Sequence, residues 1–156
     1  MVMNYEDLHP ITDWAQVLQL RDADLFSPAE LTLIDAACRG ETAQIGATVP
    51  NLRSPAVLIR AALLRYFILG GCEGFRAQPQ GIAVNGAWIA GALDLSFTKT
   101  TGPIDLYNCY VATKPQMVQM RADGVALVGC TLADGVERST GAGQWKPDAE
   151  RKYQYR

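Results

Sequence analysis

Three segments of the chain repeat the same pattern of apolar and small residues. They are IAVNGAWI from Ile82, IDLYNCYV from Ile104 and VALVGCTL from Val125, so the repeat recurs at nearly equal intervals. Each segment reads apolar, any, apolar, any, Gly or Asn, small, any, apolar. A repeat of this length predicts stacked units in which equivalent positions form columns, and this constrains the fold more than any bulk property.

The columns predict parallel strands that turn a corner at the same point of each unit. Apolar residues that alternate at period two are typical of a strand with one buried face. The next column holds residue types that tolerate a left-handed backbone, namely Gly86, Asn108 and Gly129. The column after it holds small residues expected to point inward, namely Ala87, Cys109 and Cys130. This pattern predicts a short right-handed parallel β-solenoid of about three coils.

A second apolar pair is visible further along each unit. In ALDL, Leu93 and Leu95 are expected to point inward, and the matching positions in MVQM are Val118 and Met120. The interval between these two pairs is longer than the interval of the main repeat. We therefore expect a short insertion at TKPQ, residues 113–116, where a proline favours a turn.

These segments resemble known repeat proteins. GAWIAGALDL resembles the coils of pentapeptide-repeat and related right-handed β-helical proteins. Together with IRAALLRYFILGG, the chain also resembles an uncharacterised bacterial family that joins a helical N-terminal segment to such coils. The resemblance covers roughly residues 55 to 135, and the five-residue motif is interrupted after Leu95 and after Val111. It implies a right-handed β-helix that follows a helical segment.

Two helices are predicted near the start of the chain. The earlier one spans Asp13 to Leu20. The later one has Ser27 at its N-cap, Pro28 at its first position and Glu30 placed to complete a capping box. It is expected to end near residue 39, because Gly40 is a typical helix terminator.

A third helix is predicted from Ser54 to the glycines at 70–71. It is apolar on nearly every face, which is typical of a buried helix, and we expect Leu63 and Phe67 to pack on the first coil. Arg60 and Arg65 are expected to extend their charged ends to solvent or to pair with the acidic N-terminal helices, with anion binding as the alternative. The predicted class is α+β.

The repeat and the helices together predict three regions. A helical cap covers residues 1–80, the solenoid covers residues 81–136, and a C-terminal tail covers residues 137–156.

Composition predicts a cytoplasmic protein without a membrane span. The net charge of −2 gives no bulk attraction for nucleic acid or for anionic lipid. The first residues show no basic stretch followed by an apolar run, and no apolar run approaches the length of about 20 residues that a span needs. The four cysteines include no close pair in sequence, which favours a reducing compartment.

No residue set predicts catalysis, a metal site or a cofactor. His9 is the only histidine and is expected in a surface loop, and the chain has neither CxxC nor HxxxH. Cys109 and Cys130 are expected to be neighbouring core residues. β-Helical glycosidases and lyases place catalytic acids on an outer face, and Asp94 and Asp105 are the acids of this chain that could be placed in the same way. We expect both carboxylates to be solvated and not catalytic.

The tail interleaves basic and aromatic residues, a composition that suits contact with a partner. The candidate partner-binding residues are Trp145, Lys152, Tyr153, Tyr155 and Arg156. Such residues also stack on and neutralise nucleic acid, which is the alternative for this segment.

The sequence favours a non-enzymatic protein–protein interaction module. A small phage or bacterial inhibitor or adaptor that acts on a larger complex, such as a defence nuclease, fits the size of the chain and its lack of a catalytic set. The alternatives are a DNA-mimicking, topoisomerase-binding protein of the pentapeptide-repeat type and a degenerate enzyme domain. A homodimer through the open end of the last coil is also expected, and the alternative is that the segment KYQYR, residues 152–156, folds back as a covering strand.

Overall fold

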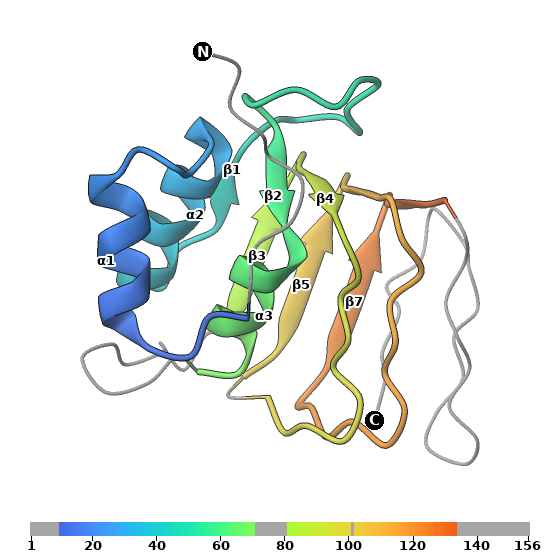
Figure 1. Cartoon of the computed structure of the whole chain (residues 1–156). Coiled ribbons are helices and arrows are strands. Elements are labelled where there is room, and N and C mark those ends of the chain that lie inside the picture. The colour runs from blue at the N-terminus through green and yellow to red at the C-terminus, as the bar shows by residue number, and fades with distance from the viewer. Residues whose placement is uncertain (1–9, 71–80, 101, 134–156) are drawn as a thin grey trace.

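The computed structural model describes residues 10–70, 81–100 and 102–133. These residues form a mixed α/β structure with three helices and two parallel four-stranded sheets (Figure 1). The first sheet has the order β1 (Ala43–Gln44), β3 (Ile82–Asn85), β5 (Ile104–Tyr107) and β7 (Val125–Val128). The second sheet has the order β2 (Leu58–Arg60), β4 (Trp88–Ala90), β6 (Tyr110–Val111) and β8 (Thr131–Leu132).

The repeat is paired in the register that the sequence predicts. Ile82 lies opposite Ile104, and Ile104 lies opposite Val125. The second and last apolar columns are paired in the same way, the last one in the other sheet. Each repeat unit therefore contributes one strand to each sheet, and the apolar columns fill the core between the sheets.

The predicted corner between the two sheets is confirmed. Gly86, Asn108 and Gly129 all have positive φ angles, of 78°, 50° and 68°. The residue that follows each of them points inward, and Ala87 and Cys109 are fully buried. An L-residue rarely adopts this conformation, so the Gly and Asn column is a direct consequence of the corner.

The predicted insertion at residues 113–116 is wrong. Two isolated parallel bridges, Asp94 with Gln116 and Lys99 with Arg121, keep the same interval that separates Ile82 from Ile104. Leu95 therefore matches Met117, which is buried, and does not match Met120. The burial of Leu93 and Leu95 is as predicted.

A second left-handed corner explains why the predicted register of residues 113–120 is wrong. Phe97 and Gln119 have φ angles of 59° and 52°, and they occupy equivalent positions of successive units. Neither residue is a type that favours this conformation. The corner therefore leaves no signal in the sequence. Met117 and Met120 are both apolar and three residues apart, so the sequence does not show which of them matches Leu95.

The predicted third helix begins later than expected. Residues 58–60 form β2, which pairs in register with β4, and α3 spans only Ala61–Ile68. A short apolar run fits a buried strand and a buried helix equally well, so periodicity could not separate them. Leu63 and Phe67 are buried as predicted. With β1 and β2, each sheet has four strands where the repeat predicts three.

Helix α2 (Pro28–Arg39) begins where its capping residues predict, with Ser27 as its N-cap in a complete capping box with Glu30. Helix α1 (Trp14–Asp22) has Asp13 as its N-cap and ends two residues after the predicted Leu20. Gly40 ends α2 in the left-handed conformation. Helix α2 packs on β1 and β2, so it covers one end of both sheets, whereas β7 and β8 lie at the other end (Figure 1).

A buried ion pair joins α2 to β2. The side chains of Glu30 and Arg60 are almost fully buried, and Arg60 Nη2 lies 2.8 Å from Glu30 Oε1. Arg60 Nε and its backbone N–H each donate to Glu30 Oε2 at 3.0 Å. Arg60 Nη2 also donates to the carbonyl oxygen of Leu25. These bonds confirm the predicted pairing of Arg60 with the N-terminal helices.

Substitution of the corner glycines should destabilise the fold. A Cβ at Gly129 would lie 2.7 Å from Asn108 Oδ1, and the φ of 68° adds strain, so Gly129→Val should cost about 1–3 kcal/mol. Gly86→Ala should also be destabilising, because its Cβ would overlap the backbone of Gly46. Gly124→Ala is the control, since nothing lies within 4 Å of its Cβ. Urea unfolding measures all three, and equal stability of the Gly124 and Gly129 variants would contradict the corner.

Removal of one partner of the buried ion pair should be strongly destabilising. Glu30→Gln or Arg60→Met should each cost about 3–5 kcal/mol, because the remaining charge is buried without its counter-charge. The double variant Glu30→Gln with Arg60→Met should cost less than the sum of the single variants. The exposed pair Asp35 and Arg39 gives the control: Arg39→Ala should change the unfolding free energy by less than about 1 kcal/mol. Additive costs in the double variant would show that the two charges do not act as a pair.

Candidate functional site

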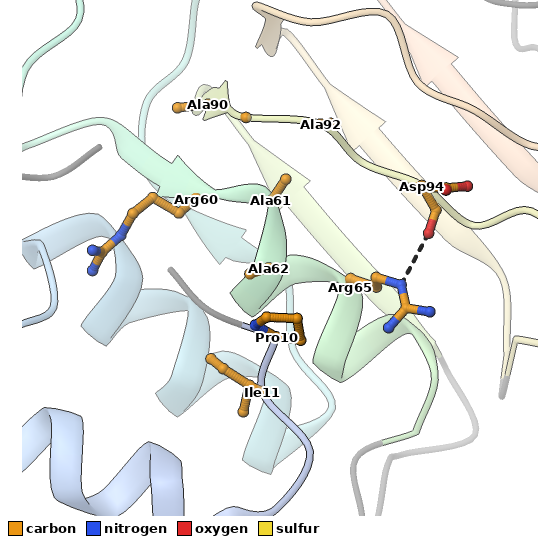
Figure 2. Close-up of a pocket in the computed structure, with 10 residues that line it drawn as sticks. Pro10, Ile11, Arg60, Ala61, Ala62, Arg65, Ala90, Ala92 and Asp94 are labelled. Atoms are coloured by element: carbon orange, nitrogen blue, oxygen red, sulfur yellow. Dashed lines mark hydrogen bonds between the residues drawn. The ribbon is translucent and has the colours of Figure 1, made fainter. Parts of the chain in front are cut away.

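A cavity of about 500 Å³ opens where the first turn of α3 meets the chain that follows β4. Most of its lining is small or apolar, as the close-up in Figure 2 shows: Pro10, Ile11, Ala61, Ala62, Ala90, Gly91 and Ala92. The charged residues that line it are Arg60, Arg65 and Asp94. This volume lies in the range typical of small-molecule sites.

The cavity lies where the chain leaves the second sheet after β2. The pairing of β2 with β4 ends at Arg60 and Ala90, where the chain turns into α3. In the next layer the ladder reaches the same level, where the N–H of Ala112 donates to the carbonyl oxygen of Ile89. No described strand covers residues 91–92, and small side chains leave the space above them open.

The two arginines of the cavity have different roles. The guanidinium of Arg60 turns away from the cavity to Glu30 and is engaged there (Figure 2). Arg65 Nε donates to the backbone oxygen of Asp94 at 2.9 Å, which holds its guanidinium beside that residue (Figure 2). One oxygen of the Asp94 carboxylate accepts from the N–H of Ser96, also at 2.9 Å. Of the two arrangements expected for Arg65, the described structure does not show the pairing with the N-terminal helices.

The structure does not bring Asp94 and Asp105 together as a catalytic pair. Asp105 lies within β5 of the first sheet, between Ala83 and Ala126 of the neighbouring strands. Asp94 follows β4 and bridges Gln116 outside both sheets. Among the described residues, no group of three or more His, Cys, Asp or Glu side chains could hold a metal ion.

Cys109 and Cys130 are neighbours in adjacent layers, as predicted. The backbone N–H of Cys109 donates to Cys130 Sγ at 3.4 Å. The hydrogen bond with the Cys130 side chain, followed by burial, raises the pKa of the Cys109 thiol well above its ordinary value. The same side-chain hydrogen bond lowers the pKa of Cys130, which is only partly buried. A thiolate in this pair therefore forms first on Cys130.

The other predicted site residues lie outside the described residues. These are the tail residues Trp145, Lys152, Tyr153, Tyr155 and Arg156, together with His9. The cavity leaves little trace in the sequence, because its lining is mostly small or apolar and comes from three separate segments. The sequence singles out three of its lining residues separately, Arg60 and Arg65 for anion binding and Asp94 as a candidate acid, but it does not bring them together.

Comparison with known proteins gives no relative from which a function can be transferred. No family model, no curated protein and no solved structure matches the chain. Within the described part of the chain, no helix has the length and apolar character needed to cross a bilayer.

Cys130 should be the more reactive thiol of the pair. In a Cys38→Ser and Cys72→Ser background, iodoacetamide at about pH 7.5 should modify Cys130 faster than Cys109, because the Cys130 pKa is lowered and its side chain is more accessible. Cys109→Ala should raise the Cys130 pKa and slow its alkylation, with the pH profile read by mass spectrometry. Cys130→Ala is the control and should leave Cys109 slow, since burial persists. Faster modification of Cys109 in the folded protein would contradict the assigned order.

Proposed function

We propose that the chain is a non-enzymatic protein-interaction module built on a short right-handed parallel β-solenoid, and that it works in the cytoplasm. The two sheets of paired repeats support this architecture. The proposed contact surface is the end of the stack formed by β7 and β8. The observation that carries the proposal is the difference between the two ends of the sheets.

One end of the stack is covered and the other is open within the described residues. Helix α2 packs on β1 and β2. Beyond β7 and β8, residues 10–133 with their gaps supply no further strand or helix. Proteins seldom leave such an edge uncovered, because its backbone groups pair readily with another chain. The uncovered end therefore favours a partner that completes the sheets.

The backbone of β7 offers specific groups to such a partner. Asn108 and Ile104 donate to the carbonyl oxygens of Val128 and Gly124, so these residues of the β7 segment face β5. Backbone groups of successive strand residues point to opposite sides. The N–H and C=O groups of Val125 and Leu127 consequently face away from β5 and can pair with an added strand.

A second copy of the chain is the partner that we propose. Two open ends related by a two-fold axis form a self-complementary contact, which is the commonest arrangement in homodimers. The tail that follows, including Trp145 and Tyr153, is proposed to add contacts to the partner.

Light scattering of the full chain at tens of micromolar should give the mass of a dimer. Val128→Lys should shift the protein toward monomer, because Val128 ends the outermost strand and two copies would place like charges at the contact. Tyr107→Lys is the matched control: Tyr107 lies opposite Val128 but one strand further in, and this variant should remain a dimer.

A full chain that is monomeric at this concentration would overturn the dimer. If that monomer became a dimer only after truncation at Gly141, the tail would be the cover of the open end.

A further inference from the structure

Cys109 and Cys130 are held in register at the corner between the two sheets. Backbone hydrogen bonds of 2.9 Å join the two layers on both sides of these cysteines, from the N–H of Asn108 to the oxygen of Val128 and from the N–H of Thr131 to the oxygen of Cys109. Paired strands lie about 4.8 Å apart, and the Cα atoms of disulfide-bonded cysteines lie about 4.4–6.8 Å apart. The register therefore places the two cysteines at a separation from which a disulfide can form.

The two thiol groups are in contact inside this corner. The backbone N–H of Cys109 donates to Cys130 Sγ at 3.4 Å, and the two side chains share a hydrogen bond. Both cysteines are free thiols. A bond between their sulfurs needs a movement of the two side chains, whereas the pairing of the strands around them already has the required register.

The two thiols differ in exposure and in ionisation. Cys109 is fully buried, whereas Cys130 is partly exposed in the outermost described layer. The side-chain hydrogen bond with Cys109 lowers the pKa of Cys130, and the same bond, followed by burial, raises the pKa of Cys109. Redox-sensitive cysteines have a lowered pKa and access to solvent, and they often lie beside a second cysteine that resolves the oxidised form. Cys130 fits the first role and Cys109 fits the second.

We propose that Cys130 and Cys109 form a peroxide-sensitive dithiol that closes to a disulfide in the folded protein. The Cys130 thiolate attacks one oxygen of the peroxide, so that an S–O bond forms, the O–O bond breaks and the leaving oxygen takes up a proton. The Cys109 sulfur then attacks the sulfenic acid on Cys130: the S–S bond forms, the S–O bond breaks, and the hydroxyl group leaves as water with the thiol proton. With hydrogen peroxide, the two thiols lose two electrons and the peroxide is reduced to two water molecules. Exchange with a small thiol reductant restores the pair.

The disulfide closes one complete coil of the stack. The two cysteines are 21 residues apart in the sequence, and β6 and β7 lie between them. A covalent bond at this corner ties the outermost described layer to the layer beneath it, in addition to the backbone ladder. Oxidation should therefore slow hydrogen exchange at the β7 amides that bond to β5, because local opening of the outer layer is restricted.

The test uses the full chain with Cys38→Ser and Cys72→Ser, treated with excess hydrogen peroxide in its folded state. We expect the intact mass to fall by two hydrogen atoms and to recover with dithiothreitol. Trypsin cleaves after Arg121 and so separates the two cysteines, and the non-reduced peptide map should contain one cross-linked pair of peptides. The disulfide should form faster in the folded protein than in urea, because the register holds the two sulfurs together.

Two matched variants separate the roles of the two thiols. Alanine occupies the equivalent position of the preceding layer, at Ala87, so Cys109→Ala and Cys130→Ala should both keep the fold. Cys109→Ala should accumulate the sulfenic acid on Cys130, where dimedone traps it, because no second thiol resolves it. Cys130→Ala should leave Cys109 reduced, because that thiol is buried.

Three results would overturn the proposal: a pair that stays reduced in excess peroxide, a disulfide that forms only in urea, and a disulfide between the Cys130 residues of two chains in place of the bond within one chain. The oxidation is repeated at low chain concentration, where a dimer dissociates, so that a partner covering β7 and β8 is not the cause of a negative result. The bond within one chain is expected at both concentrations, and the mass of the chain by light scattering tests the dimer separately.

Discussion

The carboxylate of Glu30 sets the geometry of the N-terminal half of the molecule. It accepts hydrogen bonds from the backbone N–H groups of Ser27 and Arg60 and from the Arg60 guanidinium. Ser27 is the N-cap of α2, and Arg60 is both the last residue of β2 and the N-cap of α3. One buried group thus fixes the start of two helices and the end of a strand. Because both charges are buried, the pair is stable only when every bond is made, which couples the docking of α2 to the pairing of β2.

The position of this junction determines what the rest of the stack can do. Since the chain leaves the second sheet at Arg60, α3 takes the place where the next strand residues would lie above Gly91 and Ala92. The apolar side chains of α3 continue the core, whereas the small residues at its first turn leave the cavity open. The helical end of the molecule is therefore closed to strand addition and contains the cavity. The opposite end has an unpaired edge in the described structure and suits a protein partner.

The sequence predicted the features that depend on neighbouring residues, such as helix caps, and those that depend on equivalent positions of successive repeats. The capping box at Ser27 and Glu30 is a short local signal, and the Gly86, Asn108 and Gly129 column follows from the φ angle at one corner. The first layer was missed because α3 lies between Ala43 and its partner Val84 in the sequence, so β1 and β2 break the period of the repeat. The partner of Arg60 is distant in sequence and the cavity is lined from three segments, so neither leaves a periodic trace.

Stacking of equivalent positions also explains where chemistry arises in this fold. Each column places like groups on adjacent layers, as in the stacked rings of Trp88 and Tyr110 and the hydrogen bond that Asn85 Nδ2 donates to Gln44 Oε1. In the cysteine column, stacking gives two identical thiols different pKa values. The pKa of Cys109 is raised and that of Cys130 is lowered, because Cys109 donates a hydrogen bond to Cys130 and is buried more deeply. The columns do not give every group a partner, since Asp105 lies between Ala83 and Ala126, whose side chains have no polar atom. Stacking therefore places like groups together without pairing all of them. Within the described residues, the backbone groups that the stack leaves for another chain are those of the edge strand β7.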